Sequence, residues 1–69
     1  MEPRERLLLE RARQGLSRRG LAERSGVNEH TISELERGVR TPRETTWARL
    51  AEALGIELGE LLGKAPAPV

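Results

Sequence analysis

Five glycines divide the chain into short segments, and their positions constrain the fold more than any other feature of the sequence. These glycines are Gly15, Gly26, Gly38, Gly55 and Gly63. Glycine enters the left-handed backbone conformation without steric cost, so it commonly follows the last residue of a helix. Between the glycines, apolar residues recur at the spacing of amphipathic helices, with no strand-like alternation. The sequence therefore predicts an all-α protein, a compact five-helix bundle.

The same pattern gives approximate bounds for the helices. We expect them over residues 3–13, 18–25, 29–37, 42–54 and 57–62, followed by a short Pro-containing tail over 64–69. Ser17 and Asn28 stand where a side-chain oxygen can accept from a free N–H of a first helical turn. Thr41, Pro42 and Glu44 resemble an N-cap, a proline at the first helical position and a capping-box glutamate. These signals predict where the second, third and fourth helices begin.

Apolar residues at helical spacing predict the core. The inward-facing positions are Leu7, Leu8 and Arg11 in the first helix, Leu21 and Ala22 in the second, Ile32, Leu35 and Glu36 in the third, and Trp47, Leu50, Ala51 and Leu54 in the fourth. The spacing of Trp47 favours core packing over a role as an interface anchor. Leu58, Leu61 and Leu62 either close the core or face a partner protomer, and the sequence leaves both open.

Composition excludes several classes of site. The sequence has no Cys, no Asp, one His and one aromatic residue, Trp47. Disulfides, thiolate zinc sites and an aromatic platform for stacking bases are therefore excluded. No set of nucleophile, base and orienting residue can be assembled, and no glycine-rich phosphate loop is present. We expect a protein that is not an enzyme and that holds neither a metal nor a cofactor.

Length and hydropathy bound the location of the protein. The longest apolar run is Leu7-Leu8-Leu9, too short for a membrane span, and the first residues lack the apolar stretch of a signal peptide. We therefore expect a soluble, cytoplasmic protein. A chain of 69 residues suffices for one small domain, over 1–63, without a separate ligand-binding domain, so no small-molecule ligand is expected.

Charge is distributed unevenly along the chain. The net charge is only +1, from twelve Arg and Lys against eleven Glu. Residues 1–43 nevertheless carry a net charge of +3, and residues 44–69 a net charge of −2. The near-neutral total therefore hides a basic first part of the chain, which is suited to a partner that carries negative charge.

The centre of the sequence contains two short predicted helices, over 18–25 and 29–37, joined by only three residues. The small Ala22 lets these helices approach closely, and Gly26 allows a sharp turn between them. The second helix then presents a polar outer side that contains Glu29, His30, Ser33, Glu34 and Arg37. This is the layout of a helix-turn-helix, in which the second helix enters the major groove of DNA.

Residues 16–38, together with Thr41-Pro42 and residues 50–55, carry a resemblance to a known family. They resemble the phage Cro-and-repressor type of helix-turn-helix, also termed XRE-type, and the resemblance extends over about residues 4–63. It implies that residues 1–63 form a DNA-binding domain of the lambda-repressor-like fold. It also implies that the protein binds double-stranded operator DNA, usually as a homodimer, and acts as a sequence-specific transcriptional regulator such as a repressor.

The resemblance further implies roles for individual residues. The base-facing positions of the family map onto Glu29, His30, Ser33 and Glu34. The phosphate-facing positions map onto Arg18, Arg37, Arg40 and Arg43, and Arg19 lies in the same basic cluster and is expected to contact phosphate too. A structural Arg–Glu pair of the family maps onto Arg11 and Glu36. The family more often has Gln at the position of Arg18, where Arg keeps the donor role and adds charge.

Some of these positions depart from the family pattern or leave alternatives open. Glu29 and Glu34 could accept from cytosine N4, but a carboxylate also repels phosphate. Their alternative is a solvated face with local pairing, for example of Glu34 with Arg37. His30 either donates to a guanine acceptor or is a plain surface residue. Gly20 interrupts the second helix where the family has a better helix former.

Two other functions remain for a chain of this kind. One is an antitoxin-like or adaptor module of the same fold, which would bind a protein partner through the last helix or the tail. The other is a non-specific architectural DNA binder. A net charge of +1 disfavours the latter, because non-specific binding relies on excess positive charge.

Overall fold

The computed structural model describes residues 2–63, which form five helices and no strand. The helices are α1 (Pro3–Arg13), α2 (Arg18–Ser25), α3 (Glu29–Glu36), α4 (Glu44–Leu54) and α5 (Leu58–Leu61). The predicted all-α architecture is confirmed. None of these helices is both long and apolar enough to cross a membrane. The tail predicted over 64–69 lies outside the described residues.

Side-chain caps and glycine turns bound the helices near the predicted positions. Ser17 Oγ accepts from the Gly20 N–H at 2.9 Å, and Asn28 Oδ1 accepts from the N–H two residues further on at 2.7 Å. Gly26 ends α2 with a φ of +75°, in the left-handed region. The bounds of α1 and α2 match the prediction, and α3 ends at Glu36, one residue earlier than expected.

The start of α4 differs from the prediction. Thr41 is not its N-cap and Pro42 is not its first residue, because the helix begins at Glu44. Arg43 precedes it with an extended backbone, φ −72° and ψ 157°, and makes no side-chain cap. The Arg43 carbonyl accepts from the N–H of Trp47 at 3.2 Å, so the first helical turn closes there. The local capping signal at Thr41 is thus not realised, because such local preferences are weak next to the tertiary context.

Two smaller corrections concern α1 and α5. Leu8 is 44% exposed and does not share the buried face of Leu7. Successive residues of a helix point about 100° apart. Because Leu7 and Glu10 are the buried residues of α1, Leu8 is carried to the surface. The fifth helix is shorter than expected, since Glu57 and Leu62 flank it as caps instead of lying within it.

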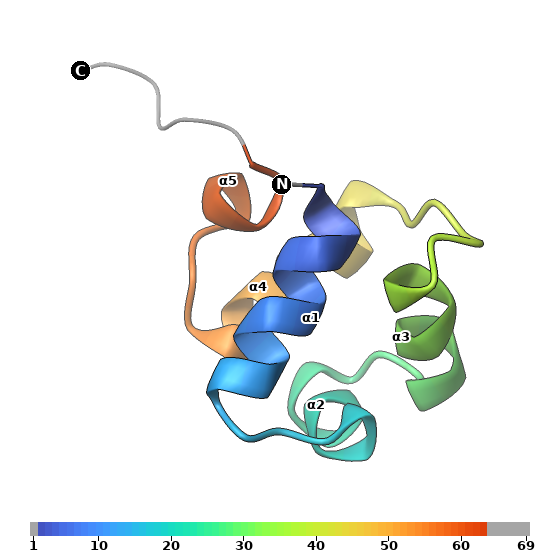
Figure 1. Ribbon diagram of the computed structural model, residues 1–69, viewed down its shortest axis with the longest axis vertical. Coiled ribbons are helices and arrows are strands. Elements are labelled where there is room, and N and C mark those ends of the chain that lie inside the picture. Colours follow the sequence, from blue (N-terminus) through green and yellow to red (C-terminus); the bar gives the residue numbers. More distant parts are fainter. Residues whose placement is uncertain (1, 64–69) are drawn as a thin grey trace.

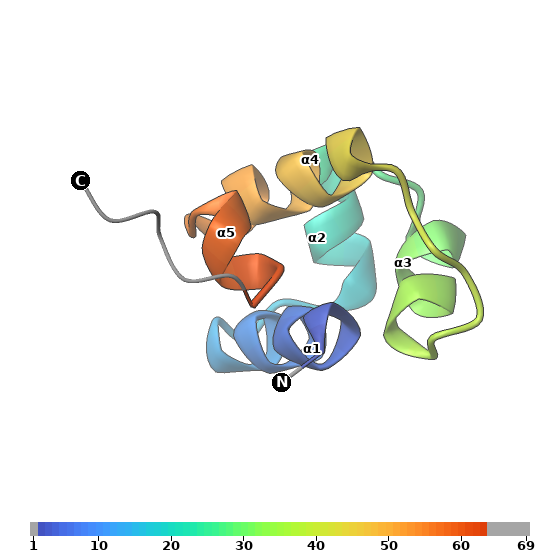
Figure 2. The ribbon, with the colours of Figure 1, turned by 90° about the horizontal axis from the view of Figure 1, so that it is seen from above.

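The helices are arranged so that α3 lies at one edge of the molecule (Figures 1 and 2). In both views α5 lies on the opposite side, and α1, α2 and α4 lie between the two. The connection from α3 to α4, residues 37–43, runs along the same outer edge as α3 in both views. This arrangement leaves one side of α3 and the neighbouring loop without cover from another helix.

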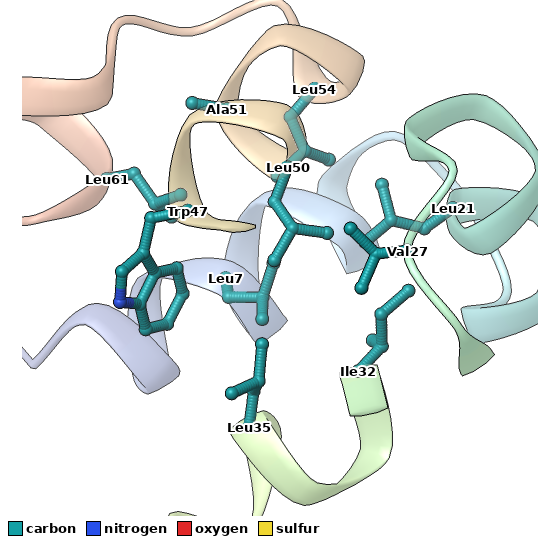
Figure 3. Packing of buried hydrophobic residues seen from close by; sticks show 10 residues of the cluster. All are labelled: Leu7, Leu21, Val27, Ile32, Leu35, Trp47, Leu50, Ala51, Leu54 and Leu61. Atoms are coloured by element: carbon teal, nitrogen blue, oxygen red, sulfur yellow. The ribbon is translucent and has the colours of Figure 1, made fainter. Parts of the chain in front are cut away.

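A single apolar core holds the helices together (Figure 3). It contains Leu7, Leu21, Val27, Ile32, Leu35, Trp47, Leu50, Ala51, Leu54 and Leu61. Trp47 lies in the core, as predicted from its spacing. Leu61 is fully buried, and Leu58 and Leu62 pack against the core partly buried, so α5 closes the core. Burying a leucine side chain fully stabilises a fold by about 1.5–3 kcal/mol.

Candidate nucleic-acid interface

One side of α3 is fixed in the core, and the other is outward. Ile32 and Leu35 are 0% and 1% exposed and point into the core, where Leu35 approaches Leu7 (Figure 3). Because buried positions recur every three or four residues, these two side chains fix the rotation of the helix. The remaining positions include Glu29 and His30, which are exposed, and Ser33 and Glu34, which are partly exposed. The expected base-facing residues therefore share one accessible side.

The linker between α2 and α3 is anchored rather than merely short. The Gly26 N–H donates to the Ala22 carbonyl at 2.9 Å as the backbone turns into the left-handed region. Val27 follows and is only 8% exposed, and its N–H donates to Ser25 Oγ at 3.1 Å. An apolar residue inserted between the two helices fixes how they cross, and so fixes how far the outward side of α3 projects.

A buried carboxylate joins the first three helices. Arg11 Nε donates to Glu36 Oε2 at 2.7 Å, and Arg11 Nη2 donates to Glu36 Oε1 at 3.1 Å. Arg11 Nη1 also donates to the Leu16 carbonyl at 2.9 Å. The Glu36 side chain is 2% exposed, so this charge depends on the paired guanidinium for compensation. The two residues that the sequence names as a structural pair thus lie in direct contact.

Arg18 is a second partner of the same carboxylate. Its Nε donates to Glu36 Oε1 at 2.9 Å, although its side chain is 44% exposed. Within residues 2–63, the Nη1 and Nη2 groups of Arg18 form no hydrogen bond. A guanidinium offers five N–H donors, so one edge can be held by Glu36 while the others face outward.

A shallow concavity of about 480 Å³ brings Arg18, one of the five expected phosphate-facing residues, together with three of the four expected base-facing residues. It is lined by Arg18 from the start of α2 and by Asn28, Glu29, His30 and Ser33 from the start of α3. The helix-turn-helix geometry places these residues side by side although ten residues or more separate Arg18 from the others. Donors suited to phosphate therefore adjoin side chains suited to base edges.

The other arginines expected to meet phosphate are exposed. Arg19 pairs weakly with Glu23, at 3.8 Å between two exposed side chains. Arg37 Nε reaches the Ser33 carbonyl at 3.4 Å. Arg43 is exposed at the N-cap of α4. Arg40 lies between Arg37 and Arg43 in the loop that runs along the edge of α3. These four arginines, at the start of α2 and from the end of α3 to the start of α4, are therefore all accessible to solvent.

Glu34 pairs differently from the alternative raised by the sequence. Arg37 is not its partner. Arg40 Nη1 donates to Glu34 Oε1 at 3.3 Å, and His30 Nε2 lies 3.6 Å from the same oxygen. Residues 37–40 turn back at Gly38, which has a φ of +73°, and this turn brings Arg40 to the carboxylate.

Comparison with known protein families gives a match over residues 7–61 to the family described as helix-turn-helix. The chain belongs to the helix-turn-helix family. The match covers all of the core residues and both helices of the motif. The Cro-and-repressor type resemblance seen in the sequence is thereby confirmed.

A related helix-turn-helix protein supports this assignment. It is the "Uncharacterized HTH-type transcriptional regulator y4dJ" of Sinorhizobium fredii, which is 40% identical over 52 residues. The aligned segment covers 75% of this chain and 68% of the relative. Membership of the family indicates a DNA-binding transcriptional regulator and favours a binding protein over an enzyme. Among residues 2–63, no group of three or more His, Cys, Asp or Glu residues could hold a metal ion.

Sequence reasoning missed three features of this helix-turn-helix domain. Val27 was not expected in the core, although it is the only apolar residue of the linker. Glu10 is 8% exposed and lies within 3.5 Å of Arg6 and 3.3 Å of Arg13. Its position three residues after Leu7, on the same side of the helix, could have predicted that Glu10 is buried. The contact of Arg18 with the buried carboxylate had no signal in the sequence, because 18 residues separate the partners.

Proposed function

We propose that this chain is a sequence-specific double-stranded DNA-binding transcriptional regulator, a repressor, that inserts α3 into the major groove. One observation carries the proposal. The inner side of α3 is locked in the core, while its outer side holds four polar residues at an uncovered edge of the molecule. The relative from Sinorhizobium fredii bears the description of a transcriptional regulator, which supports the same conclusion.

The dimensions of α3 suit the groove. An α-helix with its side chains is about 10–12 Å in diameter, and the major groove is about 12 Å wide. Glu34 then lies beside the groove with its carboxylate on Arg40, and Glu29, His30 and Ser33 face the base edges. Base edges present donors and acceptors in a distinct pattern for each base pair, so these side chains would supply the sequence preference.

The surrounding arginines supply the affinity. Arg18 and Arg19 at the start of α2, and Arg37, Arg40 and Arg43 in the loop after α3, would contact the sugar-phosphate backbone and set the register of α3 on the duplex. If each protomer neutralises about four phosphates, a bound dimer gives a log–log salt slope of about −7, from about −0.9 per phosphate. The proposal therefore predicts a strong salt dependence of DNA binding in addition to a sequence preference.

A homodimer is part of the proposal. An eight-residue helix reaches only a few base pairs, and two copies related by a two-fold axis double the length of sequence that is read. Binding to a duplex also blocks other proteins from the same bases, which makes repression the simplest regulatory outcome. The antitoxin-like or adaptor alternative gains less support, because Leu61 of α5 is fully buried and is not available to a partner.

Selection of bound sequences from random duplexes tests the proposed function. We expect a two-fold symmetric site with half-sites about one helical turn apart, and a steep salt dependence of binding to it. His30→Ala should change the base preferred at one position of each half-site. Equal binding to all duplexes, or a salt slope near zero, would contradict the proposal.

A further inference from the structure

Glu34 differs from the other residues on the outward side of α3, because its carboxylate is already engaged. Arg40 Nη1 donates to Glu34 Oε1 at 3.3 Å, and His30 Nε2 lies 3.6 Å from the same atom. The Glu34 side chain is 25% exposed, compared with 77% for His30 and 54% for Arg40. One oxygen of the carboxylate, Oε1, is therefore contacted by two side chains that are themselves accessible.

The backbone of Glu34 also holds the loop that carries Arg40. The Glu34 carbonyl accepts from the Val39 N–H at 3.1 Å, and the Gly38 N–H donates to the Leu35 carbonyl at 3.1 Å. With Gly38 in the left-handed region, these two bonds form a Schellman turn at the end of α3. Residue 34 thus binds the loop twice, through its carbonyl and through its side chain.

The other carboxylate on the outward side of α3, that of Glu29, differs from Glu34 in its contacts. Glu29 is exposed, and within residues 2–63 its side chain forms neither a hydrogen bond nor an ion pair. Both carboxylates were expected to face bases. Glu29 has both carboxylate oxygens unpaired among the described residues, whereas Oε1 of Glu34 is already bound to Arg40.

We propose that Glu34 is a positioning residue, which orients Arg40 for contact with the DNA backbone and does not itself read a base. The inference rests on the proposed function. When Nη1 of Arg40 is held by Glu34, its Nε and Nη2 groups keep their donors for a phosphate oxygen. A side chain that is already ordered loses less conformational entropy when the phosphate binds. Pairing with Arg40 also offsets the repulsion between this carboxylate and the DNA backbone.

A double-mutant cycle tests this role. The variants are Glu34→Gln, Arg40→Ala and the double variant, and the measured quantity is affinity for the selected site at one salt concentration. Removing a carboxylate tightens binding to any DNA in both backgrounds, so this effect cancels when the two arms of the cycle are compared. We expect the change in affinity on Glu34→Gln to be about threefold less favourable for each half-site when Arg40 is present than when it is absent, as for loss of one exposed ion pair.

In the Arg40→Ala background, Glu34→Gln should only tighten binding through the removed charge, because the residue to be oriented is gone. The base preferred at every position should also stay that of the parent. An equal effect with and without Arg40, no effect in either background, or a changed base preference would each overturn the proposal.

Glu29→Gln serves as the matched comparison, because it removes the same charge from the same side of α3 without touching Arg40. We expect it to change the preferred base at one position. Failure of the parent protein to select any sequence would refute the proposed function itself. A parent that selects a site, with Glu34→Gln shifting its base preference, would overturn only the role of Glu34.

Discussion

Arg18 and Glu36 are joined through Nε and Oε1 at 2.9 Å, so the side chain at the start of α2 is held by the buried carboxylate of the last residue of α3. The same carboxylate is bound by Arg11 of α1. The residue expected to grip phosphate is therefore part of the network that fixes the orientation of α3 relative to α2. Arg18 thus belongs both to the buried network around Glu36 and to the proposed phosphate contact, and variants of Arg18 can test the two roles.

Replacing Arg18 should weaken DNA binding without changing sequence preference. Arg18→Ala should reduce affinity for the selected site and for random duplex by the same factor, about tenfold per protomer, as expected for a hydrogen bond to a charged group. The salt slope of a dimer should become less negative by about 2. Fluorescence anisotropy titrations over a series of salt concentrations measure both quantities.

Arg18→Lys is the informative companion variant. Lysine keeps the charge, but its three N–H donors lie on one nitrogen and lack the planar geometry by which a guanidinium binds Glu36 on one edge and phosphate on another. We expect it to lose most of the affinity that Arg18→Ala loses. Full retention of affinity by the lysine variant would show that charge alone matters, and that the contact with Glu36 does not.

Breaking the buried pair should destabilise the domain. Glu36→Gln leaves Arg11, whose side chain is 15% exposed, without a charged partner. We expect the free energy of unfolding to fall by about 3 kcal/mol, measured by urea denaturation. As a control, Glu23→Gln breaks a pair between two exposed side chains 3.8 Å apart and should cost less than about 0.5 kcal/mol. Equal effects of the two variants would contradict a structural role for Glu36.

The turn between α2 and α3 should tolerate little besides glycine. A Cβ added at Gly26 would meet no atom within 4 Å, so any cost of Gly26→Ala comes from the positive φ of +75°. We expect a loss of about 1 kcal/mol in unfolding free energy, the strain of a left-handed residue. Asparagine tolerates this region better, so Gly26→Asn should lose less. The reverse order would indicate that space, and not backbone strain, limits this position.

The closing of the core by α5 can be tested with two matched substitutions. Leu61 is 0% exposed, whereas Leu8 is 44% exposed. Leu61→Ala should lower the unfolding free energy by about 3 kcal/mol, and Leu8→Ala should change it by less than about 0.5 kcal/mol. Thermal or urea unfolding measured at several protein concentrations would show whether either effect depends on self-association. A small effect of Leu61→Ala would contradict the core role of α5.

The sequence by itself determined the helices and their order. Ser17, Asn28 and Gly26 act on their immediate neighbours, through hydrogen bonds two or three residues away or through one backbone angle. Apolar spacing likewise fixed which side of α3 and α4 is buried, because the helical repeat places those residues on one side. These are local effects, so the residues that cause them stand close together in the chain.

Only the tertiary structure decided the remaining features. It placed the start of α4 at Glu44 and carried Leu8 to the surface, because the packing of each helix as a whole selects the buried side. It also brought Arg18 into hydrogen-bonding contact with Glu36, 18 residues away, and Arg40 with Glu34, 6 residues away. An arginine side chain can reach several acidic groups, and which one it meets depends on how the helices and loops come together in space.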